Sequence, residues 1–150
     1  MVDIREVPRV EDLFGISDKL LREHWDEVAL NKHLMVLNPD WEQYQKMCDA
    51  GVLLSLAAYD NGELVGYSIN VVTNHPHYKH LMVLRNDLLF VSKQYRNSSI
   101  GMRLMSATEE KAKSRGVKLV LWHAKQGTAL DYLLSRRGYM TQDIIYSKEI

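Results

Sequence analysis

The stretch from Arg85 to Trp122 constrains the fold more than any other part of the sequence. It reads as a strand at Arg85–Ser92, a helix from about Ile100 to Arg115, and a nearly all-apolar strand at Val117–Trp122. Such an apolar run is typical of a strand that is buried on both faces, as in parallel sheets. Two strands joined through a helix are expected to form a right-handed parallel crossover. The pattern therefore predicts a sheet that contains a parallel pair.

The other segments indicate a hairpin with helices packed around it. Asn61-Gly62 separates two strand-like runs, Val52–Tyr59 and Glu63–Thr73, and Asn-Gly in this setting is the strongest short hairpin signal. The polar, His-rich stretch Asn74–Leu84 is expected to be a loop with some strand at its end. Further strands are expected at Val2–Val7 and Tyr139–Ser147, and helices at Val10–Glu23, Asp26–Leu37, Trp41–Ala50 and Thr128–Arg137. The predicted fold class is α/β (α+β with a mixed, mostly antiparallel sheet and the parallel crossover at its centre), in one domain of residues 1–150.

Composition narrows the range of functions. The chain has 19 Lys and Arg against 19 Asp and Glu, which gives a formal net charge of zero. Without net charge or a basic stripe, it is not expected to bind nucleic acid or an anionic membrane. No apolar run is long enough to span a bilayer, and the charged start MVDIREVPRVEDLF does not resemble a signal peptide. The single cysteine, Cys48, excludes an internal disulfide. A cytoplasmic protein is therefore expected.

The segment VSKQYRNSSIG, Val91–Gly101, joins the first strand of the crossover to its helix. The first amides of a helix lack internal partners and lie at the positive end of the helix dipole. Small residues let a ligand approach this backbone, while Arg96 adds positive charge and Ser98 and Ser99 add hydroxyl groups. These features suit a phosphate or pyrophosphate. The alternative is an ordinary strand-to-helix turn with a solvated Arg96, and spacing alone leaves both open.

This segment resembles the acetyl-CoA-binding signature of the GCN5-related N-acetyltransferases, the GNAT family, which reads roughly V-x-P-x-x-R/Q-x-x-G-x-G/A. Val91 matches its hydrophobic start, Arg96 its basic or amide position, and Gly101 its last small residue. The order of elements also matches, so the resemblance covers nearly the whole chain. ALDYLLSRRGYM, residues Ala129–Met140, is similar to the family's fourth helix and closing motif. The sequence is most like small phage- or bacterium-encoded members.

The resemblance implies an N-acetyltransferase that uses acetyl-CoA as co-substrate and no metal. In this family a primary amine, on a small molecule or a protein, attacks the thioester directly. The alternative is a non-catalytic GNAT-fold module that binds CoA or a protein partner. Three positions depart from the family pattern: Ser99 replaces Gly, Lys93 replaces Pro, and Leu134 replaces the Tyr that often serves as proton donor. Homodimers are common in the family, often through the final strand.

The resemblance also implies where the reaction takes place. The family separates its fourth and fifth strands, pantetheine lies between them, and a backbone N–H near Val91 receives the thioester oxygen. Asp87 is the first candidate for the base, because it lies four residues before Val91, near where many relatives place a Glu, and strand alternation places it on the face of Leu89 and Val91. The alternative is that Asp87 caps a turn or pairs with Arg85. His123, at the end of the fifth strand, is the second candidate. The expected coenzyme-binding residues are Val91, Arg96, Asn97, Ser98, Ser99, Ile100, Gly101 and Met102.

Two further groups of residues could contact the acceptor or a metal ion. Trp25, His33 and Tyr44 belong to the N-terminal helices, which wall the acceptor site in this family, so they are the expected acceptor contacts. His75, His77 and His80 could converge on zinc. No second cluster of ligands supports a metal there, and this loop is expected to be exposed or to contact the acceptor.

Overall fold

The structure, a computed structural model, describes residues 1–14 and 18–150. Its strands form one sheet in the order β1-β2-β3-β4-β5. The first four strands pair antiparallel, and β5 pairs parallel to β4, which confirms the mixed sheet. The strands are β1 (Asp3–Glu6), β2 (Leu53–Asp60), β3 (Glu63–His75), β4 (Tyr78–Val91) and β5 (Leu119–Leu121). The helices are α1 (Val10–Phe14), α2 (Lys19–Val28), α3 (Trp41–Asp49), the 3-10 turn η1 (Lys93–Tyr95), α4 (Ile100–Ser114) and α5 (Ala129–Arg136).

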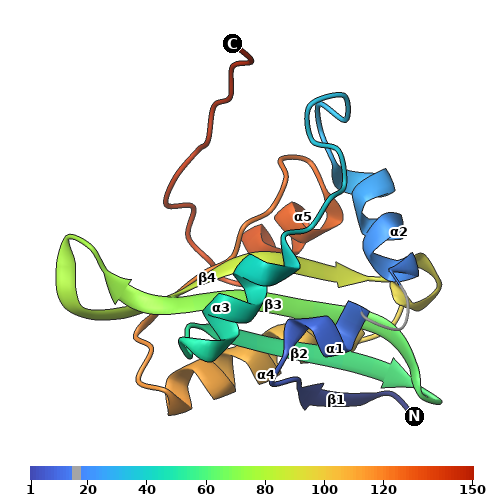
Figure 1. Ribbon diagram of the computed structural model, residues 1–150, viewed down its shortest axis with the longest axis horizontal. Helices are drawn as coiled ribbons and strands as arrows, with labels where there is room; N and C mark the ends of the chain where they lie inside the picture. The colour runs from blue at the N-terminus through green and yellow to red at the C-terminus, as the bar shows by residue number, and fades with distance from the viewer. Residues whose placement is uncertain (15–17) are drawn as a thin grey trace.

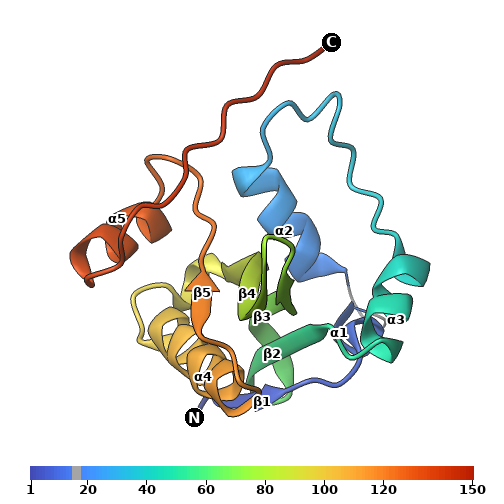
Figure 2. The ribbon, with the colours of Figure 1, turned by 90° about the vertical axis from the view of Figure 1, so that its left-hand side faces the viewer.

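Helices cover both faces of the sheet. Figures 1 and 2 show α4 on one face and α1, α2 and α3 on the other. Apolar side chains of the strands alternate between two cores, one beneath the N-terminal helices and one beneath α4. The N-terminal core includes Tyr67, Ile69 and Phe90, and the α4 core includes Leu54, Leu84 and Leu104.

The hairpin between β2 and β3 turns at the predicted position. Asp60 pairs with Glu63 across a two-residue loop. Asn61 and Gly62 have φ angles of 48° and 83°, as the favoured hairpin turn requires. The Asn-Gly prediction is therefore confirmed.

The His-rich stretch is not a loop, as the sequence suggested, but a second hairpin. β3 and β4 pair from Thr73 and Val83 out to His75 and Tyr78, so most of Asn74–Leu84 belongs to the ladder. Backbone hydrogen bonds between the two strands hold this arm. Its polar side chains are exposed, so they lose no hydration when the hairpin forms. The prediction failed because apolar periodicity is weak where neither face of a strand is covered.

Two other predictions are wrong, and a third falls partly outside the described residues. Residues 29–37 contain no helix, although one was expected over Asp26–Leu37; Leu30, Leu34 and Val36 there are exposed. Within the helix expected at Val10–Glu23, α1 and the first half of α2 are helical, and Gly15, Ile16 and Ser17 lie outside the described residues. The strand expected at Tyr139–Ser147 does not form, and residues 140–150 leave the body of the molecule with exposed side chains (Figure 1). The segments 29–37 and 140–150 are largely exposed, so they lack the packing surface that a helix or a strand requires.

The crossover ends in separated strands. β5 pairs with β4 only at Val83 with Leu119, Leu84 with Val120, and Arg85 with Leu121. β4 continues beyond Arg85 to Val91, where it has no β5 partner. The parallel pair lies at one end of the described sheet and not at its centre, as was expected, and β5 is half-buried because no described strand covers its outer edge. No helix among residues 1–14 and 18–150 is long and apolar enough to cross a membrane.

Candidate active site

A β-bulge in β4 decides where Asp87 points. Ile69 pairs with Leu88 and Asn70 with Asn86, so Asp87 is an extra residue in the ladder. A bulge interrupts the alternation of side chains. Asp87 therefore shares the face of α3, whereas Leu89 and Val91 pack in the α4 core. The expectation that Asp87, Leu89 and Val91 lie on one face is wrong for this reason.

Tyr44 of α3 meets Asp87 at the start of the gap between β4 and β5. Its hydroxyl donates to Oδ2 of Asp87 over 2.6 Å. Burial, reinforced by this hydrogen bond to Asp87, raises the pKa of Tyr44, so the hydroxyl keeps its proton. Asp87 itself is exposed. The structure thus brings together the candidate base and one candidate acceptor contact.

A buried polar network fixes the bulge from the other side. Nδ2 of Asn86 donates to the Leu88 carbonyl at 3.1 Å and to Oδ1 of Asn70 at 2.9 Å. Asn70 in turn donates to Oγ of Ser68 and the Leu54 carbonyl. Asn70 and Asn86 are almost completely buried. Because each amide is held by several partners, the backbone around Asp87 has a defined shape.

The segment between β4 and α4 presents unpaired amides. Among the described residues, the backbone N–H groups of Asn97, Ser99, Gly101 and Met102 have no acceptor. Ser99, the N-cap residue of α4, makes no side-chain cap bond. The Ile100 N–H donates only a long hydrogen bond, of 3.4 Å, to the Ser98 hydroxyl oxygen. The arrangement is chemically suited to an anion with several oxygens.

Two residues of this segment explain how the family pattern can vary. Ser99 has a φ of −79°, so no glycine is required at this position. At Gly101 an added Cβ would meet only Cγ2 of Val91, at 3.9 Å. Internal packing therefore does not demand a glycine at position 101. The space above this backbone is open to a ligand.

Arg96 does not present a free charge. Its Nη1 and Nη2 donate to the two carboxylate oxygens of Glu27, the latter over 2.6 Å, and its Nε donates to the Val91 carbonyl at 2.9 Å. Its guanidinium carbon lies 5.0 Å from the centre of the Phe90 ring. The side chain was expected to face a phosphate. Its charge is instead paired with the carboxylate of Glu27, in α2.

Val91 turns its polar groups toward the gap. The Ser92 N–H donates to the Val65 carbonyl of β3 at 2.9 Å. Alternate residues of a strand present their backbone groups to opposite sides, so the N–H and carbonyl of Val91 face away from β3. This is the side on which β5 has already diverged. An N–H directed into the gap is the feature expected of a donor to a thioester oxygen.

The remaining predicted residues lie further from Asp87. His123 follows β5, is exposed, and has no hydrogen bond or ion pair with a described residue. Nε1 of Trp25 donates to the Met35 carbonyl at 2.7 Å, and Nε2 of His33 lies 2.9 Å from Oε2 of Glu149. These contacts hold the 29–37 segment and the C-terminal segment. Roles for His123, Trp25 and His33 stay predictions.

Sequence reasoning missed two carboxylates of α2. Glu23 accepts hydrogen bonds from the Ser92 hydroxyl at 3.2 Å and the Lys93 N–H at 3.1 Å, and Glu27 holds Arg96. Their i, i+4 spacing was a visible signal of a shared helix face. Nothing in the sequence indicated their partners 69 and 70 residues away.

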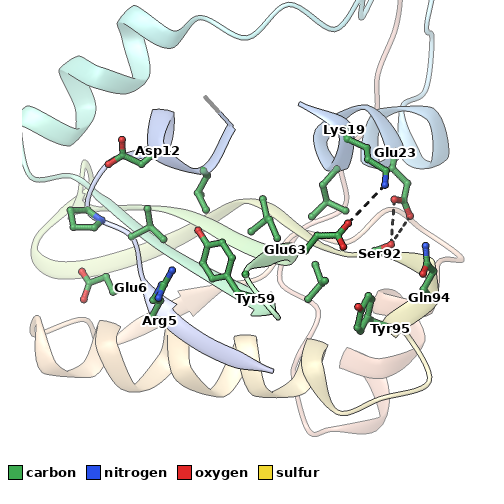
Figure 3. Close-up of a pocket in the computed structure, with 17 residues that line it drawn as sticks. Arg5, Glu6, Asp12, Lys19, Glu23, Tyr59, Glu63, Ser92, Gln94 and Tyr95 are labelled. Carbon is green, nitrogen blue, oxygen red and sulfur yellow. Dashed lines mark hydrogen bonds and ion pairs between the residues drawn. The ribbon is translucent and has the colours of Figure 1, made fainter. Parts of the chain in front are cut away.

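Figure 3 shows Glu23 and Ser92 at the edge of a cavity of about 610 Å³. The cavity lies between α1, α2, β1 and the β2–β3 hairpin, and its described lining includes Arg5, Tyr59 and Tyr95. None of the predicted site residues lines it. In the part of the chain that the structure describes, no group of three or more His, Cys, Asp or Glu could hold a metal ion. His75 and His77 lie at the tip of the β3–β4 arm, with ring centres 5.7 Å apart.

The sequence matches the Acetyltransferase (GNAT) family over residues 18–139. The chain belongs to the GNAT acetyltransferase family. Its separated strands and its unpaired amides at the start of α4 lie where the resemblance predicts the coenzyme site, and their roles stay predictions. Membership makes the chain an acetyltransferase, and acetyl-CoA is the acetyl donor of this family.

Solved GNAT structures share the fold across the whole chain. An aminoglycoside acetyltransferase, HMB0005, from an uncultured soil metagenomic sample is 16% identical, with a TM-score of 0.77 over 100% of this chain and 99% of that one. A ribosomal-protein-alanine N-acetyltransferase from Brucella melitensis biovar Abortus 2308 is 19% identical, with a TM-score of 0.69 and coverage of 100% and 97%. AAC(6')-Iy in complex with the bisubstrate analogue CoA-S-monomethyl-acetylneamine is 18% identical, with a TM-score of 0.68 and coverage of 100% and 99%. No curated protein sequence matches the chain.

Proposed function

We propose that this protein transfers an acetyl group from acetyl-CoA to a primary amine by direct attack of the amine on the thioester. The observation that carries the proposal is the set of unpaired amides at Asn97, Ser99, Gly101 and Met102 beside two separated strands. These amides would receive the diphosphate oxygens. The gap beyond Arg85 and Leu121 would receive the pantetheine arm. The Arg96 side chain is not needed as a phosphate ligand, because backbone amides and the helix dipole supply the positive potential.

Two of the three chemical tasks then have a group in the chain. The Val91 N–H would donate to the thioester oxygen as negative charge develops on it. Asp87 would accept a proton from the substrate ammonium, directly or through a water molecule, which frees the lone pair of the amine. The amine nitrogen then forms the C–N bond and loses its second proton to solvent, the C–S bond breaks, and the thiolate takes a proton from solvent. We assign this last role to solvent because Leu134, at the position where the family often has a tyrosine, cannot donate a proton.

Tyr44 would orient the carboxylate of Asp87, the proposed base. Its hydroxyl, which keeps its proton, donates to one oxygen of Asp87 and leaves the second oxygen for the substrate. His123 is the second candidate for the base, from its place after β5. The variants Asp87→Asn and His123→Gln distinguish the two, because only the variant of the true base loses turnover.

A small amine acceptor is supported by relatives of the same fold, since structures named as aminoglycoside acetyltransferases, one of them in complex with sisomicin, share it. A protein acceptor is supported in the same way by the ribosomal-protein-alanine N-acetyltransferase. An amine panel that includes aminoglycosides, polyamines and a peptide with N-terminal alanine covers both classes.

The test has two stages. Thermal unfolding is followed with acetyl-CoA, CoA, ATP and NAD, because a ligand that binds only the native state raises Tm. A rise with the CoA species alone is expected. Thiol release from acetyl-CoA is then measured with the amine panel. Binding without release for any amine would favour a non-catalytic CoA-binding module, and no Tm shift with CoA would overturn the proposal.

A further inference from the structure

We propose that Glu23 and Glu27 of α2 are positioning residues for the coenzyme loop, defined here as residues 92–101. They hold this loop in the shape in which its amides are open to a diphosphate. The inference rests on the proposed function, since it assigns a role in binding CoA. It concerns residues that make no contact with the coenzyme themselves.

The two carboxylates hold the loop at its beginning and its middle. Glu23 accepts hydrogen bonds from the Ser92 hydroxyl and from the Lys93 N–H, the latter at 3.1 Å. One helical turn later, Glu27 accepts two hydrogen bonds from Arg96. Both side chains are partly buried, with exposed fractions of 34% for Arg96 and 26% for Glu27. The 3-10 turn η1 lies between these attachment points. One face of α2 therefore spans the first half of the loop.

We call Glu23, Glu27 and their bonds to the coenzyme loop the clamp. Arg96 links this clamp to the sheet. Its Nε donates to the carbonyl of Val91, the last residue of β4, and its guanidinium lies against Phe90. Phe90 in turn stacks on His24 of α2, with ring centres 4.5 Å apart and planes 12° from parallel. A bidentate arginine–carboxylate pair fixes orientation as well as distance. The hydrogen bond from Arg96 also lowers the pKa of Glu27, as a stable pair requires.

The clamp leaves the anion-binding groups untouched. Glu27 bonds to the side chain of Arg96, and Glu23 bonds to Ser92 and Lys93. Neither carboxylate accepts from the described amides of Asn97, Ser99, Gly101 or Met102. A diphosphate could therefore bind these amides without breaking the clamp. This geometry favours a positioning role over that of an internal anion that must be displaced.

The experiment compares Glu27→Gln and Glu23→Gln with a matched control, Glu42→Gln. Glu42 is an exposed helical carboxylate on α3 that pairs with Lys46 and does not touch the loop. Two quantities are measured: the Kd for CoA by titration calorimetry, and hydrogen exchange of the loop amides without ligand. Loss of one charge-assisted pair predicts a Kd about tenfold higher and faster exchange in the loop. The control should change neither quantity.

A charge exchange provides a second arm. Arg96→Glu alone places two carboxylates together and should weaken CoA binding further than Glu27→Gln does. Adding Glu27→Arg to Arg96→Glu restores an opposite pair and should recover most of the affinity and the slow exchange. Recovery would not occur if Arg96 acted as a phosphate ligand, because the double variant has Glu at that position.

The results separate the two proposals. Unchanged Kd and exchange in Glu27→Gln and Glu23→Gln would overturn the clamp, and so would tighter CoA binding, which would make Glu27 a competitor of the diphosphate. If the wild-type protein does not bind CoA, the proposed function fails. Hydrogen exchange in the variants then still shows whether α2 orders the loop.

Discussion

The hydroxyl of Tyr44 donates to Oδ2 of Asp87 over 2.6 Å, joining a helix to a bulged strand that is 43 residues away in the sequence. The contact exists because the bulge turns Asp87 out of the strand's alternation and toward α3. A carboxylate held by a proton-retaining hydroxyl has a defined direction. Two predictions follow from this pair, one for each residue.

Asp87→Asn should reduce turnover about a hundredfold, because general-base catalysis contributes on that order. The amide can still accept from Tyr44, so folding and the Kd for CoA should change little. Steady-state rates of thiol release and a CoA titration measure the two effects separately. Asp143→Asn, in the exposed C-terminal segment, serves as the control. A rate for Asp87→Asn equal to that of the control would exclude Asp87 as the base.

Tyr44→Phe removes only the hydroxyl. The lost hydrogen bond should cost about 1 kcal/mol of unfolding free energy, and turnover should fall by less than it does in Asp87→Asn. In the double variant, Asp87→Asn should hide the effect of Tyr44→Phe on turnover, because the hydroxyl acts through the carboxylate. Additive losses in turnover would show that Tyr44 acts independently of Asp87.

Gly101→Ala should weaken coenzyme binding without lowering the stability of the fold. A Cβ at this position has space within the chain, and alanine is the better helix former, so the variant should be as stable as the wild type or more stable. The same Cβ would lie where a diphosphate approaches the backbone, and the Kd for CoA should rise at least tenfold. Gly66→Ala is the contrasting variant, since its Cβ would lie 3.0 Å from the Phe90 carbonyl oxygen. It should unfold more easily.

The buried ring of His24 should make the stability of the fold depend on pH. Burial lowers the pKa of His24 from 6.5 to about 4, so the native state keeps the ring neutral while the unfolded state becomes protonated. The unfolded state therefore binds more protons below pH 6.5, and stability should fall as the pH is lowered toward 4. The full effect of about 3 kcal/mol is reached near pH 4, and roughly 2 kcal/mol of it is present at pH 5. Urea unfolding between pH 7.5 and 5 measures it, and His24→Phe should show a weaker dependence in that range. An equal slope for the variant would assign the effect to other groups.

The sequence predicted local features better than long-range ones. Turn chemistry, caps and apolar runs act over a few residues, and they predicted the turn at Asn61-Gly62 and the limits of α3, α4 and α5. The parallel pair is a long-range feature that the strand–helix–strand order predicted. The bulge at Asp87 could not be predicted, because it depends on buried hydrogen bonds from Asn86 and Asn70 across two strands. The pairing of Arg96 with Glu27 was missed for the same reason. The absent final strand shows the limit of alternation, since a strand also needs a neighbour with which to pair.

Ser99 also affects how relatives of this protein can be recognised. Its backbone turns into α4 with a φ of −79°, a conformation open to any L-amino acid. A search pattern that insists on glycine at this position would pass over this chain and others built like it. A pattern based on backbone shape would retain them, since the invariant that matters at this turn is the direction of its amides.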